Sequence, residues 1–139
     1  WITDNRLHLC HVFTVDDLKY LHRGGRVSKT AAIAGSILGI KPLLHVDNEG
    51  HLIPVGKIRG RKQSIEKLVD MMCERMGNWD NSTVAVCHGD CLSDAEYAAD
   101  LMRKKLGKKT TVHICYTGAV IGSHSGPGTL ALFFMGDQR

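Results

Sequence analysis

Aromatic residues are scarce in this chain of 139 residues, where tryptophan, tyrosine and phenylalanine together make up 6%. Proteins that hold single-stranded nucleic acid by stacking need aromatic side chains among their basic residues. The few aromatic residues here do not alternate with the basic clusters, and the net charge of +4 is mild. A module that binds nucleic acid or phosphate is therefore the weakest function class. Long apolar runs are lacking too, and none approaches the roughly 20 residues of a membrane-spanning helix.

A disulfide framework is also missing. The cysteines are five, an odd number, and lie scattered in apolar surroundings (Cys10, Cys73, Cys87, Cys91 and Cys115). This usage is typical of reduced thiols in the core of a cytoplasmic protein. Cys87 and Cys91 flank a histidine and an aspartate, but no second pair of cysteines or histidines follows at zinc-finger spacing, so no metal is predicted.

Catalytic signatures are few. The sequence has no Walker-type loop, no acidic pair suited to magnesium and no evident partner for a catalytic triad. The composition, with 43% hydrophobic and 23% charged residues, is that of an ordinary globular domain. A chain of this length can bury a core without disulfides or metals. These features favour a binding domain over an enzyme.

The hydrophobic periodicity predicts alternating strands and helices. Strands are predicted at residues 6–13, 41–47, 52–58, 83–87, 110–116 and 129–135. Helices are predicted at residues 64–76 and 93–106, the second capped by Asp90 or Ser93. A capping box of Thr14 and Asp17 predicts a short helix to Leu21. No linker divides the chain, so the order predicts one α/β domain: an α+β layer sandwich with a mixed, partly antiparallel sheet.

A further helix, from Ser28 to residue 38, is unusual because it is apolar over most of its circumference and also contains small residues. A helix that is apolar all round is buried. The small residues allow either close packing in the core or space for a hydrophobic ligand chain.

The segment IGSHSGPG (residues 121–128) carries the clearest functional signal. Its three glycines and proline bend the backbone sharply and leave amide N–H groups free to point at a ligand. His124 stands between Ser123 and Ser125. The pattern suits the binding of a carboxylate or a phosphate, and equally a tight turn with a surface histidine.

Two basic clusters allow a similar choice. Arg23 and Arg26 surround a pair of glycines between two predicted helices, and Arg59 and Arg61 belong to the run KIRGRK (residues 57–62). Each cluster suits the docking of a phosphate or an acidic partner. Solvated arginines that complement a helix dipole explain the same pattern.

Four segments together resemble the carboxy-terminal half of a DegV-family protein. This family comprises the fatty-acid-binding subunits of bacterial fatty acid kinase. The four segments are FTVDDLKYL (residues 13–21), RGGRVS (23–28), GIKPLL (39–44) and the stretch from 118 to 128. The resemblance implies a two-domain protein in which residues 1–139 form one domain and the amino-terminal domain is absent. It implies a long-chain fatty acid bound between the domains, no cofactor, and a kinase partner that phosphorylates the acyl group.

The resemblance also implies roles for particular residues. His124 is expected to hold the head group of the ligand, with further contacts from Ser123, Ser125, Gly126 and Ser28. The expected sites for phosphate handling or kinase docking are Arg23, Arg26, Arg59 and Arg61. The binding subunit is then not itself the catalyst. The alternative is an enzyme domain in which His124 acts as general base or phosphoryl acceptor beside Ser123 or Ser125.

The missing half leads to a further expectation. If it normally covers the apolar helix and the histidine segment, this domain alone exposes an apolar face. We therefore expect the isolated chain to self-associate and to bind fatty acid weakly.

Overall fold

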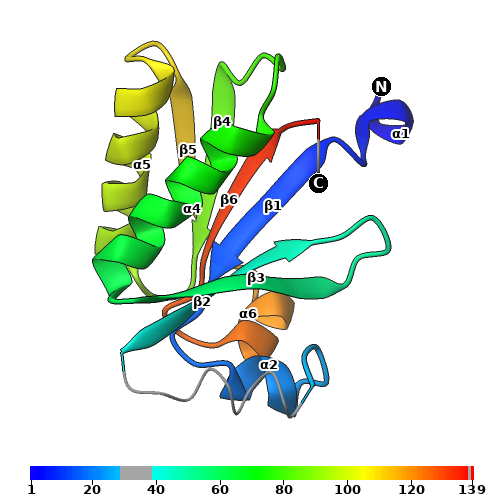
Figure 1. Ribbon diagram of the computed structural model, residues 1–139, viewed down its shortest axis with the longest axis vertical. Coiled ribbons are helices and arrows are strands. Elements are labelled where there is room, and N and C mark those ends of the chain that lie inside the picture. Colours follow the sequence, from blue (N-terminus) through cyan, green and yellow to red (C-terminus); the bar gives the residue numbers. More distant parts are fainter. Residues whose placement is uncertain (29–38, 138) are drawn as a thin grey trace.

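The fold is built on a six-stranded sheet with the strand order β3-β2-β1-β6-β4-β5. The computed structural model describes residues 1–28, 39–137 and 139. Only the pair β4–β5 is parallel among the paired strands, and the others are antiparallel (Figure 1). The strands are β1 (Leu9–Thr14), β2 (Ile40–Val46), β3 (Leu52–Arg59), β4 (Thr83–His88), β5 (Thr111–Tyr116) and β6 (Leu130–Met135). This mixed sheet confirms the predicted α/β class.

The helices divide between one face of the sheet and one of its ends. The long helices α4 (Arg61–Arg75) and α5 (Leu92–Leu106) pack against the same face, α4 over β1 and β2 and α5 over β4 and β5. The short helices α2 (Lys19–Arg23) and α6 (Ala119–Ser125) contact each other at one end of the sheet (Figure 1). A single turn, α1 (Ile2–Asn5), precedes β1.

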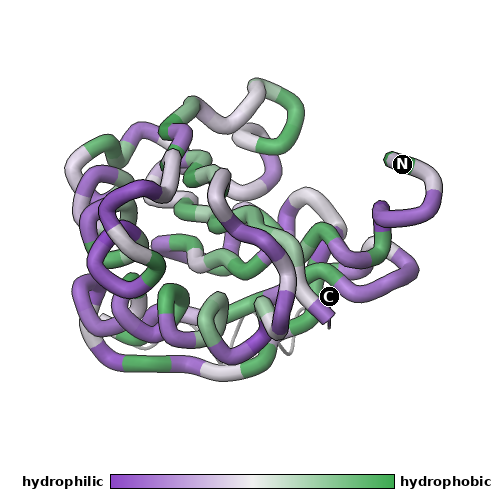
Figure 2. The backbone as a smooth tube through the Cα atoms, turned by 90° about the horizontal axis from the view of Figure 1, so that it is seen from above, coloured by the Kyte–Doolittle hydropathy of each residue, from purple (hydrophilic) through white to green (hydrophobic). Residues whose placement is uncertain are grey.

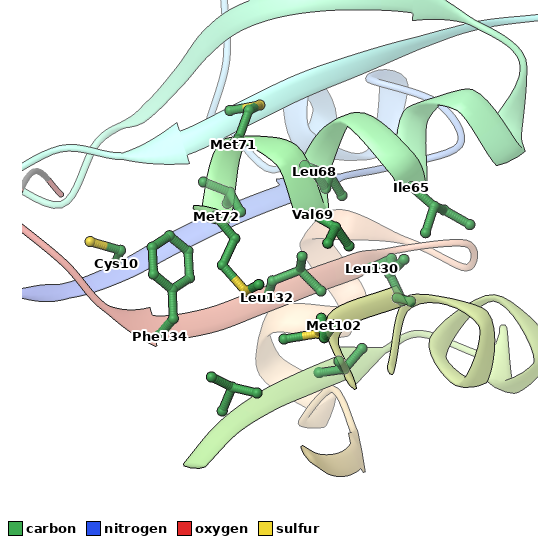
Figure 3. Packing of buried hydrophobic residues seen from close by; sticks show 14 of the residues in the cluster. Cys10, Ile65, Leu68, Val69, Met71, Met72, Met102, Leu130, Leu132 and Phe134 are labelled. Atoms are coloured by element: carbon green, nitrogen blue, oxygen red, sulfur yellow. The ribbon is translucent and has the colours of Figure 1, made fainter. Parts of the chain in front are cut away.

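The main core lies between the sheet and the helices α4 and α5. Alternate residues of the strands point to this face, and Figure 2 shows hydrophobic residues gathered in the strands at the centre of the molecule. Figure 3 shows how side chains of α4 interdigitate with those of β6 and β1. The buried residues labelled there are Cys10, Ile65, Leu68, Val69, Met71, Met72, Met102, Leu130, Leu132 and Phe134.

A second, smaller hydrophobic cluster lies on the opposite face, under α2. It consists of Phe13, Val15, Leu18, Leu21 and Leu44. Because α2 is short, it covers only the end of this face. The rest of the face, which carries the other set of alternate strand residues, is not covered by a helix of the described residues (Figure 1).

Most predicted elements are confirmed, with boundary shifts of a few residues, but two predicted caps are wrong. Thr14 ends β1 with its hydroxyl buried and without a partner among the described residues. The carboxylate of Asp17 instead accepts the N–H of Lys19, at 2.8 Å, at the start of α2. Neither Asp90 nor Ser93 caps α5. Cys91 occupies the N-cap position, and its N–H lies 3.3 Å from Nδ1 of His88.

The largest difference from the sequence prediction is α6, which overlaps the segment 121–128 interpreted as a loop. Gly122 inside the helix and a glycine at each of its caps lower the helix propensity of this stretch, so packing against α2 decides its conformation. The predicted helix at residues 28–38 lies outside the described residues, apart from Ser28. Among the helices that the structure describes, none has the length and apolarity needed to cross a membrane.

Candidate functional site

An apolar groove of about 450 Å³ runs over the uncovered face of the sheet and ends between α2 and α6. This volume lies within the roughly 300–1,000 Å³ typical of small-molecule sites. The apolar lining consists of Phe13, Leu21, Val46, Leu52, Val120, Ile121, Ala131 and Phe133. His11 lines both this groove and a wider hollow of about 820 Å³ beside α1, so the two are adjacent.

The floor of the groove is a row of residues in register across three strands. Phe13 of β1 pairs with Ala131 of β6, and Ala131 pairs with Cys87 of β4. A small residue between two larger ones leaves a depression along the sheet. The next row contains His11 and Phe133, whose rings meet edge to face with centroids 5.1 Å apart. The floor is therefore apolar and rigid, because every member belongs to a paired strand.

His124 lies at the closed end of the groove, in the last turn of α6. Its imidazole sits directly against Gly24, at the C-cap of α2. A Cβ atom built on Gly24 would lie 2.4 Å from Nδ1 of His124, far inside van der Waals contact. The backbone of Gly24 is helical, with φ −76° and ψ −4°, so it is the position of the imidazole rather than the backbone that requires glycine here.

The N–H groups of the three glycines in this segment are not free, which corrects one part of the sequence interpretation. The N–H groups of Gly122, Gly126 and Gly128 donate to the carbonyl oxygens of Gly118, Gly122 and Gly89, at 2.9, 2.8 and 2.7 Å. Gly126 instead allows close packing, since a Cβ on it would lie 2.5 Å from the ring of Tyr20. The N–H groups of Gly122, Gly126 and Gly128 are therefore not free to bind the head group of a ligand.

The two serines beside His124 use their hydroxyl protons within the helix. Ser123 Oγ donates to the carbonyl oxygen of Val120 at 2.8 Å, and Ser125 Oγ donates to that of Ile121 at 2.9 Å. Such bonds to the preceding turn compete with contacts to a ligand. Ser125 is also buried, with 3% of its surface exposed, although it lines the groove.

Thr117 is a groove residue that the sequence analysis missed. It follows β5, its N–H donates to the carbonyl oxygen of His88 at 2.8 Å, and its side chain lines the groove. Its Oγ1 is buried and has no hydrogen-bond partner among the described residues. The sequence contained a signal for this residue. The carboxyl ends of neighbouring parallel strands are frequent ligand sites, and Thr117 follows such a strand.

Of the four arginines singled out in the sequence, the structure brings one to the groove. Arg26 lines it, and its Nη1 donates to the carbonyl oxygen of Gly24 at 2.5 Å. Gly24 thus lies between Arg26 and His124. Arg23 is exposed on α2, with its guanidinium 5.9 Å from the centre of the Tyr20 ring.

The other two arginines lie away from the groove and differ from each other. Arg59 is exposed at the end of β3. The side chain of Arg61, only 20% exposed, is held inside the fold: its Nε is 2.8 Å from Asp94 and its Nη1 is 3.7 Å from Asp16. Its Nη2 also contacts the sulfur of Cys91. These contacts tie α4 to α5 and to the end of β1, so Arg61 has a structural task that the sequence did not reveal.

Burial controls the ionisation of two groove residues. It lowers the pKa of His11 to about 4, with a further contribution from the charge of Arg139, so this imidazole is neutral near pH 7. Burial likewise raises the pKa of the Cys87 thiol to about 12, assisted by the neighbouring Cys115. The floor of the groove is therefore uncharged.

The remaining candidates do not join the site. Ser28 is exposed, and it does not line the groove. The group that comes nearest to a metal site in the described part of the chain is Asp47, Glu49 and His51, at the turn between β2 and β3. Asp47 accepts the N–H groups of both of these residues, so the cluster is explained by the turn.

Comparison with known proteins gives a consistent result. Residues 1–137 match the family model described as uncharacterised protein, DegV family. A DegV domain-containing protein of Clostridium perfringens is 47% identical over 139 residues, which are all of this chain and 47% of that protein. The chain therefore spans about half the length of this relative.

Two solved structures illustrate the likeness of the fold. A fatty acid binding DegV family protein from Streptococcus agalactiae superposes with a TM-score of 0.84 at 30% identity, over 99% of this chain and 48% of the other. The fatty acid kinase B3 protein of Streptococcus pneumoniae, loaded with linoleic acid, superposes with a TM-score of 0.86 over 98% and 47% of the two chains. At 18% identity, the second likeness shows the fold alone.

Proposed function

Because this chain belongs to the DegV family, we propose that it forms half of a binding site for a long-chain fatty acid, without being an enzyme itself. The acyl chain lies in the groove over Ala131, and the carboxylate lies at the end closed by α2 and α6. The observation that carries the proposal is the apolar groove on the sheet face, ending at His124. The similar protein from Streptococcus agalactiae is a fatty acid binding protein.

The groove supplies affinity through its apolar lining. Each methylene group that leaves water for such a surface contributes about 0.8 kcal/mol. The floor is in place before the ligand binds, because its residues belong to paired strands, so little ordering is needed on binding. A neutral His11 fits this use, since a charged imidazole beside the acyl chain would have to lose its hydration.

The closed end of the groove supplies donors for the carboxylate. A buried carboxylate needs hydrogen-bond donors, and charged donors bind it most strongly. His124, Arg26 and Thr117 all line the groove. The hydroxyl of Thr117 has no hydrogen-bond partner among the described residues. In this proposal these three side chains take the place of the amides of Gly122, Gly126 and Gly128, and Ser123, Ser125 and Gly126 support α6 and its packing.

The other half of the site is proposed to come from the part of the protein that the relatives have and this chain does not cover. Large apolar side chains at the rim of the groove are exposed: Tyr116 by 70%, Val120 by 77% and Ile121 by 64%. A second domain over the sheet would cover them and close the groove into a tunnel.

The enzyme alternative has less support. A general base of the triad type needs a carboxylate that orients its imidazole. No carboxylate hydrogen-bonds to His124 within residues 1–28, 39–137 and 139, and the protons of both neighbouring serines are already used. Chemistry on the acyl group therefore falls to a partner, which we propose is the kinase implied by the sequence resemblance.

We expect His124→Ala, in the whole protein that contains this chain, to weaken fatty acid binding by about 1–3 kcal/mol, the usual loss for a charged hydrogen bond. Gly24→Ala keeps His124 but should cause a similar loss, because its Cβ would lie 2.4 Å from Nδ1 and displace the imidazole. Lipid titration measures both. Gly56→Ala is the matched control, since its Cβ would meet only ordinary contacts with Leu43. If the double variant loses the sum of the two single effects, His124 and Gly24 do not act together.

We expect Arg59→Glu to slow phosphorylation of the bound fatty acid by the kinase partner while leaving lipid affinity unchanged. An exposed charge at a rim mainly steers encounter, so the difference from the wild type should shrink as salt is raised. Initial rates at several salt concentrations measure this effect. Arg23→Glu tests the α2 side in the same assay. Reduced lipid affinity with a normal phosphorylation rate would contradict the docking role.

A further inference from the structure

Two cysteines lie side by side on the groove face without being bonded. Cys87 of β4 and Cys115 of β5 are partners in the parallel ladder, and their sulfur atoms are 2.9 Å apart. Both are free thiols. Cys115 continues the row that forms the groove floor, since Cys87 pairs with Ala131 on its other side. The pair thus joins the floor of the groove to the edge of the sheet.

The backbone at this point suits a covalent bond between the two residues. Neighbouring strands lie about 4.8 Å apart. A disulfide requires Cα atoms about 4.4–6.8 Å apart, with both side chains on the same side. Strand partners in register fall in this range of Cα distances, and the contact between the two sulfur atoms places both side chains on the same side of the sheet. Closing the bond brings the sulfur atoms from 2.9 Å to about 2.05 Å.

We propose that Cys87 and Cys115 form a dithiol modification site that small-molecule disulfides convert into a cross-strand disulfide. A thiolate of Cys115 attacks the reagent RSSR, forms a mixed disulfide and releases one RSH after proton uptake. The sulfur of Cys87, after losing its proton, then attacks the sulfur of Cys115 and releases the second RSH. Two thiols of the protein are oxidised, and the disulfide reagent is reduced to two thiols.

Exposure assigns the order of these steps. Cys115 is exposed on β5, which is an edge strand, whereas Cys87 is half-buried in the floor of the groove. The reagent therefore meets Cys115 first. Only a thiolate attacks a disulfide, and burial, which raises the pKa of the Cys87 thiol, keeps it protonated near pH 7. The second step is the slow one, and it accelerates as the pH is raised.

The other three cysteines lie in different surroundings. Cys10 is buried in the main core. Cys91 lies 3.3 Å from the carbonyl oxygen of Thr129 and contacts Arg61. Cys73 lies on α4, packed against the main core. Cys87 and Cys115, by contrast, have their sulfur atoms in contact with each other.

The test treats the folded chain with cystamine and follows its intact mass. We expect a mixed disulfide first and then a product whose mass is that of the untreated chain minus two hydrogens. The second step should be more than tenfold faster at pH 9 than at pH 7. Tryptic peptides should locate the link between residues 76–103 and 110–139. Because the first peptide also contains Cys91, Cys91→Ser is the matched control and should form the same link. Cys73→Ser should behave likewise.

Two variants assign the roles. Cys87→Ser should stop at the mixed disulfide on Cys115, and Cys115→Ser should lose the fast first step. A mixed disulfide on Cys115 that persists in the wild type, or a link through Cys91, overturns the proposal. The test uses residues 1–139 alone and no lipid, so its outcome depends neither on the proposed fatty acid site nor on the proposed second domain over the groove.

Discussion

Replacing Ala131 by tryptophan is expected to weaken fatty acid binding by about a hundredfold in the whole protein that contains this chain. Ala131 is the small residue between Phe13 and Cys87 on the floor of the groove. An indole at this position fills the space of about three or four methylene groups, and each is worth about 0.8 kcal/mol. The sum of about 3 kcal/mol corresponds to the hundredfold change. Titration with a long-chain fatty acid measures it.

Ala85 provides the matched control for this variant. It is also an alanine on the same face of the sheet, one row away, where it pairs with Phe133, but it does not line the groove. Ala85→Trp should bind fatty acid like the wild type. Ala131→Leu, with a smaller side chain, should give an intermediate loss. Equal affinity in Ala131→Trp and the wild type, with both melting alike, would mean that the acyl chain takes another path.

Arg61→Ala should lower the free energy of unfolding by about 2–3 kcal/mol, the second large effect we expect. The loss leaves Asp94 and Asp16 without the guanidinium that now lies 2.8 and 3.7 Å from them. Breaking one side of a fully buried pair costs about 3–5 kcal/mol, and the 20% exposure of this side chain reduces that cost. Urea unfolding followed by circular dichroism measures the change.

The same helix contains a suitable control. Lys67 pairs with Glu74 at 3.1 Å, but both side chains are well exposed, by 41% and 63%. Exposed pairs contribute about 0–1 kcal/mol, so Lys67→Ala should be nearly neutral. Arg61→Lys keeps the charge but loses the planar fork of donors, and should be intermediate. Equal stability of Arg61→Ala and Lys67→Ala would remove the structural role assigned to Arg61.

This role changes how a docking experiment should be designed. A reversal of both Arg59 and Arg61 would combine a surface effect with a folding defect. Arg59 is exposed and has no ion pair in the described part of the chain, so its reversal tests docking alone. The two arginines are indistinguishable in the sequence because they belong to one short basic run.

The sequence was sufficient to predict the strands of the sheet and the two long helices that cover the main core. Buried residues alternate along β6 (Leu130, Leu132 and Phe134), and apolar residues follow helical spacing along α4. Both are local patterns, and each predicts one type of element. The resemblance of four short segments likewise pointed to the family. Each of these signals depends on residues close together in the chain.

The sequence was not sufficient for α6 and for the chemistry around it. Gly122 argues against a helix, and the serines beside His124 argue for a turn. The helix forms because α2, about a hundred residues earlier, packs against it, and its formation uses the amide groups that a loop would have left free. Local propensity was overruled by a contact between distant parts of the chain.

By itself, then, the sequence determined which segments are strands and long helices and which face of each long helix is buried, because these properties follow from the spacing of apolar residues. The tertiary structure alone decided that Gly24 faces His124, that Arg61 binds Asp94 and that Cys87 lies against Cys115. Each of these pairs joins residues 28 to 100 positions apart. Their meeting depends on strand order and helix packing, which no local pattern encodes.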